Sequence, residues 1–94
     1  MDIQTVFEAL TDPNRRLIIT LLKEREMSVN EVLEHFDLSG ASLSHHLRKL
    51  KSANLIVSKR RAQRIVYSLD LDFLRKTKLA IDELLFVKPN TVYE

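Results

Sequence analysis

The scarcity of glycine and proline limits what this chain can fold into more than any other feature. One glycine and two prolines occur among 94 residues, and folds with many tight turns depend on both residue types. A sandwich or barrel of short strands would need more of them. The sequence therefore predicts a mainly helical protein, and its length fits one small domain.

The residue types that are absent exclude several classes of protein. The chain has no cysteine, so it forms neither a disulfide framework nor a thiolate metal site, and it has no cysteine nucleophile. Its apolar runs are too short to span a membrane, and the segment after Met1 lacks the basic and apolar regions of a signal peptide. We therefore expect a soluble, cytoplasmic protein with no membrane insertion.

Five segments carry apolar residues at the spacing of an amphipathic helix. Their stripes consist of Ile3, Val6, Phe7 and Leu10; Leu17, Ile18, Leu21 and Leu22; Val29, Val32, Leu33 and Phe36; Leu43, Leu47 and Leu50; and Leu74, Ile81, Leu84 and Leu85. Residues that cap helix N-termini precede these stripes. The predicted caps are Asp2, Asp12 before Pro13, Ser28 with Glu31 as a capping box, Ser39, and either Asp70 or Asp72. The second helix is expected to end near Glu26, and Asn54 is a left-handed stop for the fourth.

Two short β-type segments lie between the fourth and fifth helices. Residues 55–58 form one, and residues 64–69 alternate with Ile65, Tyr67 and Leu69 on one face. Residues 59–63 are then expected to form the tip of a hairpin. The predicted fold class is mainly α with a two-stranded β-hairpin wing, a winged helix-turn-helix in the order α-α-α-α-β-β-α. Residues 1–94 form a single domain in this interpretation.

The charges are distributed unevenly along the chain. Residues 1–47 carry a net charge of −4, residues 48–64 carry seven bases and no acid, and residues 65–94 carry a net charge of −1. A solvated surface normally mixes both signs, so a segment of one sign indicates contact with a polyanion. A basic surface without a partner is the simpler alternative.

The fourth helix and the hairpin carry the candidate DNA-binding residues. Opposite its leucine stripe, the fourth helix is small and polar near its N-terminus and basic further on, which suits insertion into a major groove. The hairpin cations suit contact with phosphates or a minor groove, although charges also protect strand edges. The predicted DNA-binding residues are Ser39, Ala41, Ser42, Ser44, His45, Arg48, Lys49, Lys59, Arg60, Arg61 and Arg64.

The histidines favour neither a metal site nor catalysis. His45 and His46 point about 100° apart on a helix, so they cannot ligate one ion together. His46 flanks the leucine stripe and is expected to pack partly buried, with one satisfied nitrogen. A zinc site made of His35, Asp37 and a second subunit is the remaining metal alternative. Ser44 and His45 do not face each other as a nucleophile and base would, so we expect no enzyme, no metal and no cofactor.

The chain resembles the ArsR–SmtB family of repressors in several segments. Residues 9–16, Ala-Leu-Thr-Asp-Pro-Asn-Arg-Arg, resemble the family's opening motif, and residues 39–50, with Leu-Ser-His-His-Leu at 43–47, resemble its recognition helix. Residues 54–56 and 67–69 resemble the segments that bracket its wing, so the resemblance spans roughly residues 5–70. It implies a winged-helix homodimer that represses transcription by binding double-stranded DNA at an inverted-repeat operator.

The first and last helices, residues 1–11 and 71–87, are the predicted dimerisation helices. The resemblance implies this pairing, and the sequence supports it, because a first helix of about nine residues is marginal alone. The apolar stripes of both helices also exceed what one small core needs. The predicted interface residues are Ile3, Val6, Phe7, Leu10, Leu74, Ile81, Leu84 and Leu85.

The chain departs from the family's metal-sensing members where they bind metal. Ser28 and Asn30 stand where soft-metal sensors carry cysteines, and the last helix lacks the histidines of zinc sensors. The chain is therefore most similar to the metal-site-lacking, SdpR-like branch. Ala62 replaces a glycine that is usual in the wing, which leaves the type of turn open.

The leading hypothesis is a sequence-specific DNA-binding repressor that acts by occupying its operator. One alternative is a winged-helix protein-interaction module that a partner protein, such as a membrane partner, sequesters. The other is an atypical metal-sensing repressor. Salt-dependent binding to promoter DNA separates the first two hypotheses, and a metal titration separates the third.

Overall fold

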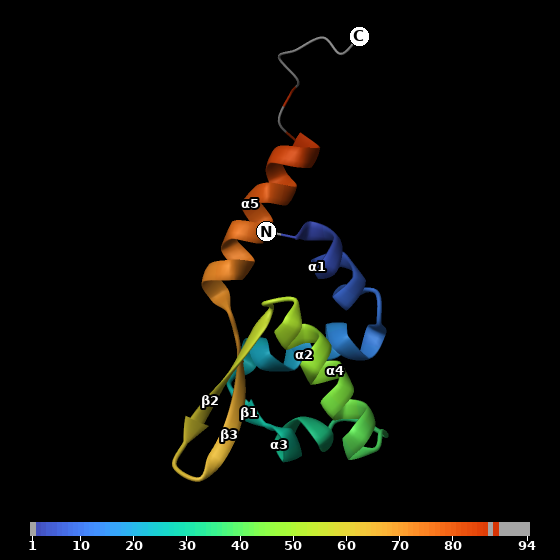
Figure 1. Cartoon of the computed structure of the whole chain (residues 1–94), viewed down its shortest axis with the longest axis vertical. Coiled ribbons are helices and arrows are strands. Elements are labelled where there is room, and N and C mark those ends of the chain that lie inside the picture. Colours follow the sequence, from blue (N-terminus) through green and yellow to red (C-terminus); the bar gives the residue numbers. More distant parts are fainter. Residues whose placement is uncertain (1, 87, 89–94) are drawn as a thin grey trace.

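The computed structural model describes residues 2–86 and 88, and the elements below lie within them. They run in the order α1 (Ile3–Leu10), α2 (Pro13–Glu24), β1 (Met27–Ser28), α3 (Val29–Leu33), α4 (Gly40–Ser52), β2 (Ile56–Arg61), β3 (Arg64–Leu69) and α5 (Leu71–Phe86). The mainly helical fold with a hairpin is confirmed (Figure 1). Residue 87, the predicted end of the last helix, and residues 89–94 lie outside the described residues. None of the described helices is long and apolar enough to cross a membrane.

Side-chain caps start the helices at the predicted residues. The Oδ1 atom of Asp12 accepts from the backbone N–H of Asn14 at 2.8 Å, and Pro13 follows as the first helical residue. Ser28 and Glu31 form the predicted capping box. Asp2 caps α1 and Ser39 caps α4. At α5, the Oδ1 atom of Asp70 accepts from the N–H of Phe73 at 3.0 Å, so Asp70 rather than Asp72 is the capping residue.

The core forms where α1, α2, α3 and α4 meet the base of the hairpin. Ile18 of α2 and Leu43 and Leu50 of α4 are completely buried there, together with Val32 of α3. Each such side chain contributes about 1.5–3 kcal/mol when it leaves water. The leucine stripe of α4 is therefore fixed inward, which directs the opposite face of this helix to solvent.

Two helices end earlier than the sequence predicted. The second helix stops at Glu24 rather than near Glu26, because Met27 and Ser28 pair with a strand. The third stops at Leu33, where tight turns replace regular helix: the N–H of His35 bonds the carbonyl of Val32 at 3.0 Å. Phe36 nevertheless packs against the core from the loop that follows.

The sheet has three strands in the order β1-β3-β2, and all pairs are antiparallel. The sequence predicted the β2–β3 hairpin, which we call the wing, but not β1. Ser28 of β1 pairs with Val66 of β3. This third strand attaches the wing to the start of α3.

The turn of the wing is shorter than predicted. Strand β2 continues to Arg61, which pairs with Arg64, so only Ala62 and Gln63 form the tip instead of residues 59–63. Ala62 adopts a φ of 55°, in the left-handed region that favours glycine. Asn54 has a φ of 63° after α4 and confirms the predicted left-handed stop.

Helix α5 leaves the rest of the chain at its C-terminal end. Figure 1 shows its last turns extending beyond α1 with no other helix or strand beside them. Leu84, Leu85 and Phe86 lie on these turns, and each is at least 64% exposed. Apolar side chains therefore gather on a part of α5 that the described chain leaves uncovered.

Candidate nucleic-acid interface

Helix α4 presents a continuous polar face to solvent. Leu43, Leu47 and Leu50 are buried beneath it. The candidate residues of this helix and its cap are all exposed: Ser39, Ala41, Ser42, Ser44, His45, Arg48 and Lys49. Small side chains occupy the first turn and cations the third, so the helix is narrow at its N-terminal end and positively charged further along. This is the arrangement that a major groove accepts.

The two faces of the wing carry different cations. Side chains alternate along a strand, so Arg60 shares a face with Ser58, whereas Lys59 and Arg61 lie on the opposite face. The Nζ atom of Lys51 in α4 donates to the Oγ atom of Ser58 at 2.8 Å, so the Ser58 face is turned toward α4. Arg60 is therefore on the α4 side of the wing.

The opposite face of the wing is held by carboxylates. Arg61 donates from Nε and one terminal nitrogen to the two carboxylate oxygens of Glu26, at 3.1 and 3.2 Å. Arg64 pairs with Glu31. Glu31 also accepts from Arg25 at 2.6 Å. We call these five side chains the wing brace: Arg25, Glu26, Glu31, Arg61 and Arg64. Within the wing brace, the two carboxylates largely offset the charges of the two wing arginines.

Glu31 is the centre of the wing brace. Its carboxylate accepts from the backbone N–H of Ser28 at 3.0 Å as part of the capping box. This backbone hydrogen bond, followed by the side-chain hydrogen bond from Arg25, lowers the pKa of Glu31 to about 2, against an ordinary 4.5. The carboxylate is therefore charged throughout the range in which proteins are usually handled.

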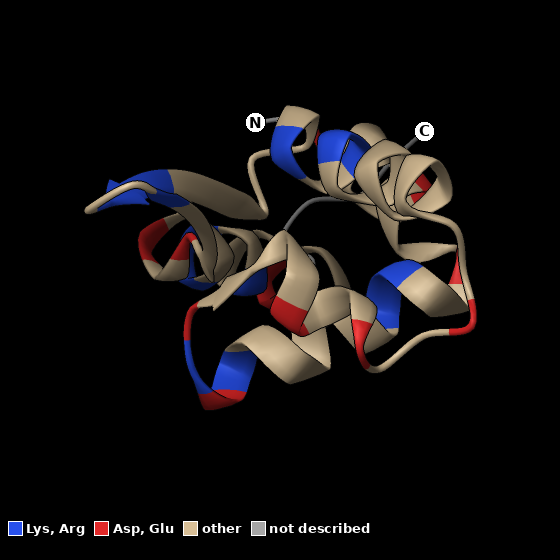
Figure 2. Ribbon diagram, turned by 90° about the horizontal axis from the view of Figure 1, so that it is seen from below, with Lys and Arg blue, Asp and Glu red and all other residues tan. Residues whose placement is uncertain are grey.

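Helix α4 and the wing follow one edge of the protein, although Lys59, Arg61 and Arg64 lie on the face of the wing that is turned away from α4. In Figure 2 the blue segments of the hairpin and of α4 follow the upper edge of the view. Lys59, Arg60, Arg61 and Arg64 are all exposed. Among the described residues, neither Lys59 nor Arg60 forms an ion pair with a carboxylate. These two cations are the ones the wing can offer without breaking a contact.

His46 is partly buried, as predicted. Its side chain is 13% exposed and its Nδ1 atom lies 4.0 Å from Oδ2 of Asp12. That nitrogen is buried and has no hydrogen-bond partner among the described residues. Within residues 2–86 and 88, no three His, Cys, Asp or Glu side chains gather closely enough to hold a metal ion.

The predicted dimer residues divide between the core and the surface. Val6 is 2% exposed and belongs to the protomer's own core, because α1 packs this residue inward. Leu10 and Leu74 pack partly against that core, and Ile3 and Ile81 are also partly buried. The residues that remain exposed are Phe7, Leu84 and Leu85. Between α1 and α5 lies an apolar groove of about 260 Å³, lined in part by Phe7, Leu74 and Ile81.

Sequence reasoning missed the acidic residues that hold the wing. Glu31 was recognised only as a helix cap, and Glu26 only as the end of a helix. Their contacts with Arg61 and Arg64 join residues more than thirty positions apart. No local sequence pattern indicates such a pair. The charge pattern did supply one signal: Arg61 and Arg64 have no acidic neighbours in sequence, so any carboxylate partner has to come from a distant segment.

Known proteins resemble this chain in sequence and in fold. Residues 12–58 match the family described as bacterial regulatory protein, arsR family. The transcriptional repressor SdpR of Bacillus subtilis (strain 168) is 46% identical over 70 residues, which cover 74% of this chain and 78% of SdpR. The arsenical resistance operon repressor of Staphylococcus xylosus is 33% identical over 73 residues, 78% of this chain and 70% of that repressor.

A solved structure gives the same result for the fold. NolR from Sinorhizobium fredii superposes with a TM-score of 0.70, at 34% sequence identity, over 92% of this chain and 86% of that one. The resemblance stated from the sequence motifs is confirmed by these similarities.

Proposed function

Because the chain belongs to the ArsR family of bacterial regulatory proteins, we propose that it represses transcription as a homodimer bound to an inverted-repeat operator. Members of this family bind double-stranded DNA and regulate transcription, and they are not enzymes. The repressor acts by occupying the operator, and it works in the cytoplasm, where its DNA lies. No bound metal is needed for this action.

One observation carries the proposal. The exposed face of α4 and the α4 side of the wing present Arg48, Lys49 and Arg60 along one edge, and no described carboxylate forms an ion pair with any of the three. A surface of this kind releases counterions when it meets a phosphate backbone. A protein surface without a polyanionic partner would have gained solubility equally well from charges of both signs.

The two parts of the surface are proposed to do different work. The α4 face, from Ala41 to Arg48, enters the major groove, where Arg48 reaches base edges and contributes about 1–3 kcal/mol of discrimination per contact. The wing contacts phosphates or the minor groove through Lys59 and Arg60. Arg61 and Arg64 contribute only when DNA competes them away from their carboxylates.

The dimer is proposed to form through α1 and α5. Leu84 and Leu85 are exposed on the projecting end of α5, and Phe7 borders the apolar groove between α5 and α1. An exposed apolar surface of this kind marks an interaction site. A two-fold axis there would present two copies of α4, which matches the symmetry of an inverted repeat.

The test combines a footprint with binding isotherms. Protection is mapped on the DNA upstream of the chain's own gene, and affinities are then measured for that site and for a scrambled duplex at three salt concentrations. We expect tight, salt-dependent binding and a clear preference for the protected site. Arg48→Ala should lower this preference about 5–150-fold per half-site, whereas Lys23→Ala, on an exposed position of α2, should not. Binding that ignores salt would favour the protein-interaction alternative.

A further inference from the structure

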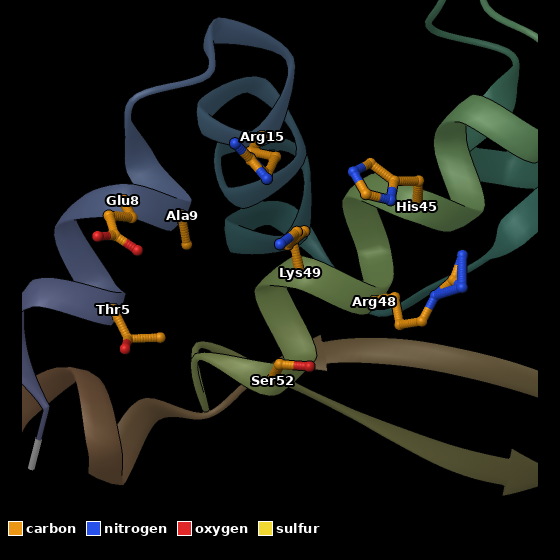
Figure 3. A pocket seen from close by; sticks show the side chains of 8 residues that line it. All are labelled: Thr5, Glu8, Ala9, Arg15, His45, Arg48, Lys49 and Ser52. Atoms are coloured by element: carbon orange, nitrogen blue, oxygen red, sulfur yellow. The ribbon is translucent and has the colours of Figure 1, made fainter.

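A groove of about 480 Å³ lies beside the candidate interface, between α1, α2 and α4. Its lining includes Glu8 of α1, Arg15 of α2, and His45, Arg48 and Lys49 of α4 (Figure 3). Three of these residues also belong to the outward face of α4. The groove therefore opens beside the surface that is proposed to meet DNA.

Arg15 enters this groove with a hydrogen-bonding capacity that the described residues do not use. Its Nε atom is buried and has no hydrogen-bond partner among them. No carboxylate of the described chain lies within ion-pair distance of its guanidinium group. Its terminal N–H groups are not among the buried unpartnered atoms, so they are the donors that an acceptor from outside can reach.

Two other cations line the groove with Arg15, namely Arg48 and Lys49, against one carboxylate, Glu8. Figure 3 shows Lys49 pointing from α4 toward Arg15, with His45 on the adjoining side. The acidic lining residue, Glu8, points away from them on α1 and accepts from the side chain of Gln4 at 3.0 Å. Two cations aimed at one space repel each other unless an anion lies between them.

We infer that this groove binds one phosphate of the DNA backbone between Arg15 and Lys49. The inference rests on the proposed function and extends the DNA interface beyond α4 and the wing to α2. A guanidinium group matches the geometry of a phosphate, because its two terminal N–H groups can donate to two oxygens. Lys49 adds a mobile point charge from the opposite wall. This contact positions the protein on the backbone and carries no base preference.

The first experiment removes the charge of Arg15. Affinities of Arg15→Gln for the operator and a scrambled duplex are measured at three salt concentrations. The slope of log affinity against log salt should fall by about 0.9 per protomer, or about twice that for a dimer, and equally for both DNAs. The preference for the operator should stay within about twofold. Arg15→Lys should restore most of the slope, because it keeps the charge.

The matched control is Lys23→Gln. Lys23 is exposed and lies on the same helix, about 12 Å along its axis from Arg15. This variant loses the same charge and should keep the slope of the wild type. Equal slopes for Arg15→Gln and the wild type, with salt-dependent DNA binding intact, would overturn the phosphate site and leave the proposed function standing. Loss of salt-dependent binding in the wild type itself would overturn the proposed function.

A second experiment tests whether both cations hold the same phosphate. Lys49→Gln changes an exposed residue, so it does not depend on the folding of an Arg15 variant. This single variant should lower the slope as Arg15→Gln does, and the double variant should lower it little further, because the groove holds its one phosphate only while both cations are present. Additive losses would mean two separate phosphates and would refute a shared site.

Discussion

Arg61, near the tip of the wing, donates two hydrogen bonds to the carboxylate of Glu26, although 35 positions separate the two residues in the chain. The side chain of Arg61 is 58% exposed and that of Glu26 is 40% exposed. Exposed ion pairs of this kind contribute about 0–1 kcal/mol. The contact is therefore strong enough to direct the side chain and weak enough for a phosphate to displace it.

The first prediction concerns a variant in which the Glu26 carboxylate no longer competes with a DNA phosphate for Arg61. Glu26→Gln should strengthen binding to operator and scrambled DNA alike, because it releases Arg61 from its ion pair and removes a negative charge that would lie near the DNA phosphates. The salt slope should rise by up to about 0.9 per protomer. Glu24→Gln, an exposed carboxylate at the end of α2, is the control for net charge. Weaker binding by Glu26→Gln would mean that the brace presents the wing to DNA instead of restraining its charge.

The second prediction concerns the dimer. Leu84→Glu should convert the protein to monomers at micromolar concentration, because it places a charge on the apolar end of α5. Sedimentation velocity measures the change directly. Leu79→Glu makes the same substitution on the same helix, roughly 160° around the axis from the predicted interface face, and should leave the dimer intact. A folded monomer in the wild type, or dissociation by both variants, would contradict the assigned face.

The third prediction is a pH dependence of stability. Folding lowers the pKa of Glu31 to about 2 from an ordinary 4.5, so its contribution is fully present above pH 4.5 and disappears as the pH falls through about 2. Glu31→Gln should therefore unfold at a lower temperature than the wild type at pH 7, and the difference should shrink between pH 4.5 and 2.

The control for this pH series is Glu34→Gln, which removes a charge from an exposed side chain three residues further on. Its unfolding temperature should stay close to that of the wild type across the series. A difference between Glu31→Gln and wild type that is constant with pH would show that the carboxylate charge is not what stabilises the fold.

The fourth prediction uses the tip of the wing. Ala62 has a φ of 55°, and a left-handed conformation costs an L-residue about 1–2 kcal/mol. Ala62→Gly should stabilise the protein by about 0.5–1 kcal/mol after the greater entropy of glycine in the unfolded chain is subtracted. Ala80→Gly, inside α5, should have the opposite effect by a similar amount. Urea denaturation of both variants distinguishes local strain from a general effect of glycine.

Local chemistry made the helices predictable. Asp12 before Pro13 and Ser28 before Glu31 start helices through contacts that span at most three residues, so the sequence contains all the information needed. The leucines of α4 likewise identify its buried face. The predicted positions on the opposite face are exposed, because the spacing of the leucines places them on the side of the helix that is turned away from the core.

Contacts between distant segments were not predictable in the same way. Strand β1 has two residues, too few to show any alternation, and it exists because β3 offers it free backbone groups. The length of the wing strands was underestimated, because a run of arginines has the composition of a loop until a partner strand supplies hydrogen bonds. Arg15 was overlooked, because only the packing of α1 against α2 and α4 creates the groove that it enters.

Ser28 takes part in two structures at once: it pairs with Val66 of the wing and caps α3. This backbone pairing ties the wing to the start of α3 and fixes the spacing between the wing and the helix-turn-helix. Because this protein surface keeps its shape on binding, the DNA has to deform in order to contact both α4 and the wing. Operators whose flexible pyrimidine–purine steps lie between the α4 site and the wing site should then bend at lower cost. Base pairs that no side chain contacts would then contribute to operator selection, because their stiffness sets the cost of bending the DNA.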